Sequence, residues 1–216
     1  MPTYNYQETF FKICEKAVDL YHQGGRNVST YFDGQELEFI RSIGAAPIDF
    51  YDYAEDYCSS QEPDFSTFLL IQAERKNYFL YEQDGQYSTT TVREEDLPAK
   101  DDEAEGIAWL PRIIEKARAK LKGEMPSTLM YCCGGDRRFL KSIDMHPAEF
   151  LVLVRRNFDD TEAIVKAVKD RKNALENDLA YKVKQSQEKM ERHGIGKESS
   201  TFEEKAKEQQ EAEKET

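Results

Sequence analysis

The chain has 216 residues, of which 39% are hydrophobic and 33% are charged, and its formal net charge is -12. A chain of this length can bury ~70% of its unfolded surface without disulfides, and no segment approaches the ~18 consecutive apolar residues of a membrane-spanning helix. Phosphate binding depends on clustered Lys and Arg, so the acidic balance argues against a general affinity for nucleic acid. We expect a soluble protein that does not enter a membrane and has no general affinity for nucleic acid.

The cysteines and the first residues indicate the compartment. Cys14, Cys58, Cys132 and Cys133 show no regular disulfide spacing, and MPTYNYQETF lacks the basic and apolar segments of a secretory signal. We therefore expect reduced thiols and a cytoplasmic protein.

Residues 5–82 show the periodicity of helices and form the first, acidic unit. In the first helix, apolar residues recur at helical spacing from Phe10 until Gly24-Gly25 ends the run. Four helices are expected, and they begin after the Asn5-x-x-Glu8 capping box, after Gly34, at Pro47 and after the cap residue Asp64.

Residues 83–106 are interpreted as an acidic linker with REEDLPAKDDEAEG at its centre. Irregular segments of this length are uncommon unless they are functional or disordered. Asp84-Gly85 is a turn signal beside β-prone residues, so a short hairpin at YEQDGQYSTTTV is the alternative.

Residues 107–192 form the second, basic unit. Its first helix opens at Leu110-Pro111 and closes at Gly123, because proline is tolerated in a first turn and glycine favours a helix end. Further helices are expected after Gly134, at Pro147 and after Asp159, which pairs with Glu162 as a capping box.

The last of these helices is long and carries a thin apolar stripe from Ile164 to Met190. This stripe exceeds the needs of one domain, so the helix either straps across both units or projects to a partner. Gly194 and Gly196 are expected to end the helix. Residues 193–216 have too little apolar content to fold and are predicted to be a disordered, charged tail.

The two units are related in sequence at an offset of 100 residues. Aligned without a gap, residues 13–50 and 113–150 share eleven identities, where chance would give ~2 at average composition. The identical pairs are Ile13/Ile113, Glu15/Glu115, Lys16/Lys116, Ala17/Ala117, Tyr31/Tyr131, Gly34/Gly134, Phe39/Phe139, Ser42/Ser142, Ile43/Ile143, Pro47/Pro147 and Phe50/Phe150. The sequence therefore predicts an all-α fold of two tandem related helical units.

The segment GIAWLPRIIEKARAKLKGEMPSTLMYCCGGDRRFLKSIDMHPAEFL resembles bacterial proteins that carry the domain of unknown function DUF5069. The resemblance lies in an aromatic-Leu-Pro-Arg helix start, a Lys-Ala-Arg-Ala-Lys-Leu run and an acidic-Phe pair. The full chain, over residues 5–170, resembles the longer, two-copy members of that group. The resemblance implies no activity, cofactor or site residue, and the tail lies outside it.

Charge differs in sign between the two units. Residues 6–56 hold ten acids and four bases, whereas residues 106–156 hold five acids and ten bases. Because complementary potentials orient association, the units are expected to dock within one chain or between chains. Exposed pairs of this kind would be screened within ~8 Å at physiological ionic strength, so any self-association should weaken with salt.

A turn in the second unit is the candidate ligand site. Two glycines before a short helix leave backbone N–H groups open, and neighbouring bases could complete a pocket for an anion. The candidate residues are Arg112, Gly134, Gly135, Arg137, Arg138 and His146. In the alternative interpretation the glycines only form a turn, Asp136 is a cap and the arginines are solvated.

Other chemistry has less support from the sequence. Zinc binding by the adjacent Cys132 and Cys133 with His146 lacks the usual Cys-x-x-Cys spacing, and nucleophilic catalysis by either thiol rests on residue type alone. Trp109, the single tryptophan, is expected to anchor its helix to the core. We assign no catalytic residue, metal or cofactor.

These observations favour a non-catalytic binding or scaffolding module that contacts a protein partner or itself. The alternative is a binding protein or enzyme for an anionic small molecule that uses the Cys132–Arg138 turn. Helix-turn-helix binding of nucleic acid by the basic unit is a third interpretation, and the acidic total opposes it.

Overall fold

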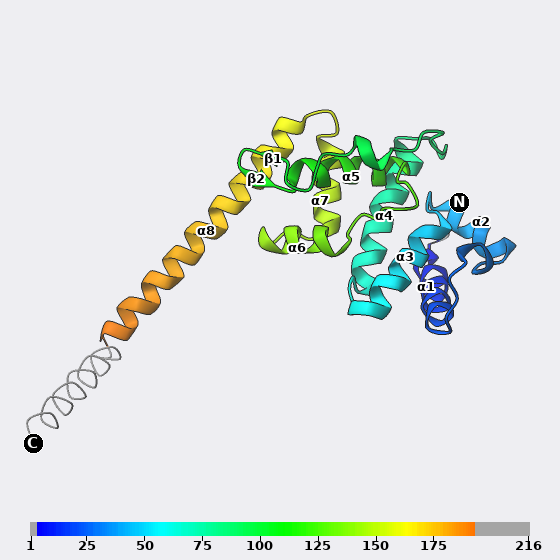
Figure 1. The fold of residues 1–216 in the computed structure, drawn as a ribbon, viewed down its shortest axis with the longest axis horizontal. Helices are drawn as coiled ribbons and strands as arrows, with labels where there is room; N and C mark the ends of the chain where they lie inside the picture. Colours follow the sequence, from blue (N-terminus) through cyan, green and yellow to red (C-terminus); the bar gives the residue numbers. More distant parts are fainter. Residues whose placement is uncertain (1–3, 193–216) are drawn as a thin grey trace, which may run out of the picture. The chain divides into compact units, whose positions relative to one another are not determined.

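A computed structural model describes the backbone of residues 4–192 and the side chains of residues 4–189. These residues are mainly helical, as the sequence predicts (Figure 1). The α-helices are α1 (Tyr6–His22), α2 (Gly34–Ser42), α3 (Pro47–Ser60), α4 (Phe65–Tyr81), α5 (Leu110–Lys122), α6 (Gly134–Ser142), α7 (Pro147–Arg156) and α8 (Thr161–Arg192). No helix in this part of the chain has the length and apolar character needed to cross a membrane.

The expectation of a purely α-helical fold needs one correction. Two short strands, β1 (Glu103–Ala104) and β2 (Ile107–Ala108), pair antiparallel immediately before α5. The turn signal at Asp84-Gly85 produces a turn without strands. Two 3-10 turns, Val28–Thr30 and Glu94–Asp96, complete the described elements.

The helix boundaries follow the local signals with two exceptions. Asp64 accepts a hydrogen bond from the Thr67 backbone N–H, and Gly123 ends α5 with a φ of 70°, both as predicted. Asn5 occupies the N-cap position of α1 but makes no capping side-chain bond. At the start of α8, the side chain that accepts from Ala163 N belongs to Asp160 and not to Asp159.

Two hydrophobic cores share α4. The first core is formed by α1, α2, α3 and the start of α4, with Phe10 and Phe50 fully buried. The second is formed by α5, α6, α7 and the start of α8, with Phe150 fully buried. Phe68 of α4 belongs to the first core, and Ile71, one turn further on, belongs to the second.

Matched contacts occur at positions 100 residues apart. Phe50 and Phe150 are the fourth residues of α3 and α7, and both are fully buried. Ser42 Oγ donates to the Phe39 carbonyl, and Ser142 Oγ donates to the Phe139 carbonyl. Lys16 pairs with Glu36, and Lys116 pairs with Asp136.

Ion pairs connect the two units, and in each pair the acid belongs to the first unit and the base to the second. Helix α4 packs against α5 and α7. Acids of α3, of α4 and of the residues directly after each of these helices face bases of α5, α6 and α7. The pairs are Asp49 with Lys120 (2.7 Å), Asp56 with Arg137 (2.6 Å), Glu62 with Lys141, and Glu74 and Glu82 with Arg155. The opposite charges found in the sequence therefore meet within the chain.

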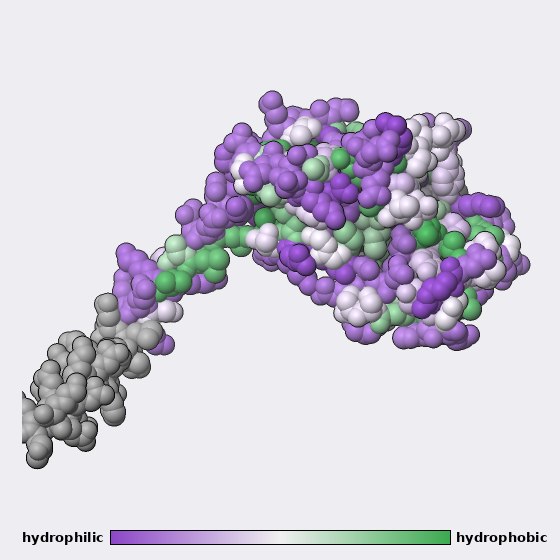
Figure 2. Space-filling view, viewed as in Figure 1, coloured by the Kyte–Doolittle hydropathy of each residue, from purple (hydrophilic) through white to green (hydrophobic). Residues whose placement is uncertain are grey.

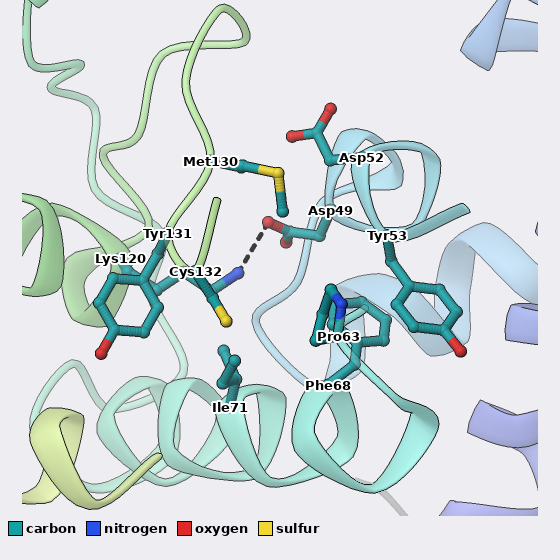
Figure 3. A pocket seen from close by; sticks show the side chains of 10 residues that line it. All are labelled: Asp49, Asp52, Tyr53, Pro63, Phe68, Ile71, Lys120, Met130, Tyr131 and Cys132. Atoms are coloured by element: carbon teal, nitrogen blue, oxygen red, sulfur yellow. Dashed lines mark hydrogen bonds and ion pairs between the residues drawn. The ribbon is translucent and has the colours of Figure 1, made fainter. Parts of the chain in front are cut away.

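A small cavity lies at this contact (Figure 3). Its volume of about 20 Å³ has room for about one water molecule. Asp49, Asp52 and Lys120 line its polar side, and Lys120 donates to Asp49 across it. Burial, with the neighbouring charge of Asp49, raises the pKa of Asp52 to about 7.

Over residues 161–189, helix α8 has buried residues only near its start. Ile164, Val165 and Val168 pack into the second core, which belongs to a compact unit that ends at Lys169. Within the separate unit that begins at Asp170, Leu179 and Val183 are 60% and 55% exposed. Figure 2 shows hydrophobic surface along this helix. The predicted tail, residues 193–216, lies outside the described residues.

Candidate functional site: a basic hollow beside Trp109

A hollow of about 700 Å³ lies where α5, the start of α6 and the segment before β1 meet. We call it the basic hollow because most of its charged residues are cations. It is lined by Glu94, Lys100, Trp109, Arg112, Lys116, Leu129, Cys133, Gly135, Arg138, Phe139 and Ser142.

A buried ion pair forms the base of the basic hollow. Asp136 has no exposed surface, and its carboxylate accepts from Lys116 Nζ, from Trp109 Nε1 at 3.0 Å and from the Cys132 backbone N–H at 2.9 Å. Lys116 Nζ also donates to Cys133 Sγ at 3.3 Å. A buried carboxylate requires such partners because desolvation of an unpaired charge is costly. This network fixes α5 against α6.

The indole ring of Trp109 is held in place by packing as well as by its hydrogen bond. A Cβ atom on Gly135 would lie 2.5 Å from Cζ2 of Trp109, so no larger residue fits beneath the ring. Trp109 is half-buried, lies next to the second core, and has a φ of 71°, in the left-handed region. The predicted anchoring role of Trp109 therefore extends to α6 as well as to the core.

The cations of the basic hollow fall into two kinds. Lys116 and Arg112 are buried, and Arg112 is held by the Pro98 carbonyl at 2.7 Å and by Glu94 at 4.0 Å. Lys100 and Arg138 are exposed and have no hydrogen-bond or ion-pair partner among residues 4–189. The exposed pair can move to contact a ligand, whereas the buried pair is held by the protein.

The N-terminus of α6 opens beside these cations without a side-chain cap. Its N-cap residue, Cys133, accepts no capping hydrogen bond, and Cys133 and Gly135 both line the basic hollow. In α2, by contrast, the Asp33 carboxylate accepts from the backbone N–H groups of Gln35 and Glu36. The first-turn N–H groups and the helix dipole of α6 therefore add positive potential to the hollow.

The structure brings together only part of the predicted site. Arg112, Gly135 and Arg138 line the basic hollow, whereas Gly134, Arg137 and His146 do not. Two of these candidates, Arg137 and His146, already have partners in the first unit. Arg137 pairs with Asp56 and donates to the Cys132 carbonyl, and His146 caps α7 and contacts Thr67 Oγ1 through Nε2 at 3.1 Å.

Two of the cations were not identified from the sequence. Lys116 is one of the residues shared between the units, and that repetition was a usable signal. Lys100 stands in a segment interpreted as an acidic linker, and no local pattern distinguishes it. Hydrogen bonds from Val92 N to the Glu124 carbonyl and from Ser88 Oγ to the Glu124 side chain attach this segment to the turn that follows α5.

The Cys132 thiol is poorly suited to act as a nucleophile. Cys132 is buried, and its burial raises the pKa of the thiol to about 12, which opposes formation of a thiolate near neutral pH. Cys133 is half-buried and lies against Lys116. Across the described part of the chain, no group of three or more His, Cys, Asp or Glu side chains is placed to hold a metal ion.

The chain belongs to the family described as "Domain of unknown function (DUF5069)", whose model matches residues 95–216. The match includes the second unit and the tail, which the resemblance drawn from the sequence had left out. It begins after the first unit, between Glu94 and Lys100 of the basic hollow. No curated protein and no solved structure matches the chain.

Proposed function

We propose that the chain is a non-catalytic binding protein of the bacterial cytoplasm, and that its second unit binds an anionic small molecule in the basic hollow. One observation carries this proposal: Lys100 and Arg138, both without partners among residues 4–189, stand with Arg112 around an uncapped helix start. Burial of the Cys132 thiol supports binding without catalysis.

Electrostatics favour an anion at this place. Lys100, Arg112, Lys116 and Arg138 outnumber the two acids nearby, Glu94 and Asp136, so the hollow keeps a net positive charge. A hydrogen bond to a charged group contributes ~1.5–3 kcal/mol. Guanidinium groups also bind carboxylates and phosphates with two parallel bonds. The helix start provides N–H donors that need no reorganisation.

We further propose that the chain is a two-copy member of its family, with residues 5–82 and 107–192 as the copies and 83–106 between them. The matched ion pairs and serine contacts 100 residues apart support duplication. The first copy would not bind the same ligand. Glu38 stands at the position of Arg138, and the Asp33 carboxylate occupies the helix start that Cys133 leaves open.

Calorimetric titration with inorganic phosphate, pyrophosphate and phosphate esters tests the binding site. We expect Arg138→Gln and Lys100→Gln each to weaken binding about tenfold, which is the equivalent of ~1.4 kcal/mol. Arg156→Gln is the matched control, because it removes an exposed cation outside the basic hollow. Failure of every anion to bind, or an equal loss in the Arg156→Gln variant, contradicts the proposal.

Self-association through α8 is a second candidate function, and the exposed stripe favours it. Leu179 and Val183, which lie one turn apart on the same face of the helix, are 60% and 55% exposed. Part of this helix also repeats α4 at an offset of 96 residues, since Arg75-Lys76-Asn77 matches Arg171-Lys172-Asn173. In α4 this segment contacts another helix, because Arg75 donates to the Leu121 carbonyl of α5 at 2.8 Å.

Sedimentation at low and high salt tests this second candidate. We expect a mass above that of one chain at both salt concentrations, because salt does not screen an apolar contact, and a lower mass for Leu179→Glu. Leu70→Glu, a change at a residue 49% exposed on α4, is the control. A single-chain mass for the unaltered protein under both conditions excludes the interaction.

A further inference from the structure

We infer that the ligand of the basic hollow is a planar organic phosphate of about mononucleotide size, with its flat group on the Trp109 side and its phosphate at Arg138 and Lys100. This inference rests on the proposed function and makes it more specific. It depends on the size of the hollow, on its apolar wall and on the place of its single unburied acid, Glu94.

Size separates inorganic anions from organic ones. The hollow of about 700 Å³ falls in the range of ~300–1,000 Å³ that is usual for organic ligands of drug size. A single phosphate ion contacting Arg138 would leave most of that space filled with water. The dimensions therefore fit a ligand that has a substantial part beyond its anionic group.

The remaining part of the ligand would meet an apolar wall. Trp109, Leu129 and Phe139 line the same hollow as the cations. The indole of Trp109 is already fixed by its bond to Asp136 and by its contact with Gly135. A ring held in this way loses little freedom on binding, and stacking on an aromatic side chain strengthens binding of a base about tenfold or more.

Glu94 argues against a ligand that is anionic throughout. Its carboxylate lies 4.0 Å from the Arg112 guanidinium and accepts from Thr128 Oγ1 at 3.3 Å. A carboxylate has about four acceptor positions, so Glu94 can still accept from a ligand hydroxyl or amino group. A polyphosphate or a polyanion passing through the hollow would be repelled there. One anionic end with neutral hydrogen-bond donors elsewhere fits this arrangement.

The single tryptophan provides a direct measurement, since its fluorescence comes only from this site. The probes are adenosine monophosphate, ribose 5-phosphate, adenosine and inorganic phosphate, titrated into the full chain. We expect adenosine monophosphate to quench Trp109 and to bind at least tenfold more tightly than each of the other three. A short oligoadenylate without a terminal phosphate is included to separate a free nucleotide from an RNA strand.

Two variants test the contacts of the phosphate and of the flat group separately. Arg138→Gln should weaken adenosine monophosphate and ribose 5-phosphate by a similar factor of about ten, because both present a phosphate. Leu129→Ala should weaken only adenosine monophosphate, by about threefold to tenfold, because only that ligand has a flat group for the apolar wall. Leu70→Ala, which shortens an exposed apolar residue outside the hollow, should change neither affinity.

The outcomes separate this inference from the proposed function. If ribose 5-phosphate or inorganic phosphate binds as tightly as adenosine monophosphate, the inference is overturned and the anion site remains. Tighter binding of the oligoadenylate overturns the mononucleotide ligand in favour of an RNA strand. If no phosphate compound binds, or if binding ignores Arg138→Gln, both the inference and the proposed function are overturned.

Discussion

The two units use the same ion pair between their first and second helices, but in different surroundings. The side chains of Lys16 and Glu36 are 38% and 23% exposed, whereas those of Lys116 and Asp136 are 3% and 0% exposed. Trp109 donates to the pair in the second unit, and Thr9 stands at the matching position in the first. One large side chain thus changes a solvated contact into a buried network that forms the base of a hollow.

Removing the acid from each pair gives the largest expected difference between the units. Asp136→Ala would leave the buried Lys116 ammonium without its counter-ion, so we expect a loss of ~3–5 kcal/mol in the free energy of unfolding. Glu36→Ala is the matched change at the partly solvated pair, and loss of the ion pair there should cost ~0–1 kcal/mol. The variant also loses the capping bond that Glu36 accepts from Asp33 N, which should cost a further ~0.5–2 kcal/mol. Urea denaturation of both variants measures the difference, and equal losses would contradict it.

The contact between Gly135 and Trp109 gives the next largest effect. Gly135→Ala would place a methyl group against the indole ring, and we expect a loss of ~1–3 kcal/mol with a change in Trp109 fluorescence. Gly134→Ala is the control, since the nearest side-chain atom to a Cβ there is 3.8 Å away. An unchanged emission spectrum in the Gly135→Ala variant would show that the ring does not rest on this residue.

Asp52 lies at the contact between the units, and its raised pKa predicts that the stability of the fold depends on pH. Because this carboxyl has a folded pKa of about 7, above its ordinary value of 3.8, the folded chain keeps the proton that the unfolded chain loses. Stability should therefore fall as pH rises from about 4 to 7, and the penalty should be complete above that window.

The variant Asp52→Asn should remove this penalty. We expect it to gain about 1–2 kcal/mol at pH 8 and close to nothing at pH 4, because one pKa unit corresponds to ~1.36 kcal/mol and partial solvation reduces the full value. Thermal unfolding across this range is the measurement, with the exposed Asp101→Asn as control. Parallel pH profiles for the unaltered chain and Asp52→Asn would refute the assignment.

The smallest effect is expected at the solvated edge of the contact. The side chains of Lys141 and Glu62 are 65% and 45% exposed, and exposed pairs contribute ~0–1 kcal/mol. Lys141→Ala should therefore cost ~0.5 kcal/mol or less, and 0.5 M salt should remove that difference. Denaturation of this variant beside Arg41→Ala, the matched position in the first unit, measures it. A loss above ~1 kcal/mol would contradict the small contribution expected of an exposed ion pair.

The sequence predicted the helices well because their signals are local. Pro47, Pro147 and Asp64 mark helix starts, Gly123 marks a helix end, and each acts within one turn of its helix. Apolar spacing likewise identified Phe50 and Phe150 as core residues. These features need no knowledge of which helix packs on which.

The candidate site was predicted only in part because it depends on long-range contacts. Arg137 and Arg138 are adjacent in sequence and could not be told apart there, yet one pairs with Asp56 and the other is open to solvent. Lys100 reaches the hollow because the segment before β1 is held against α5, where Arg112 donates to the Pro98 carbonyl. A local pattern cannot show which cation already has a distant partner.

The sharing of α4 between two cores has a consequence for cooperativity. Phe68 packs into one core and Ile71 into the other, on adjacent turns of one continuous helix. Loss of either core would therefore fray the helix that the other core needs, and Arg75 would lose its hold on the end of α5. We therefore expect the two units to melt as a single cooperative block within residues 4–169, with backbone amides in both cores showing one opening free energy in hydrogen exchange.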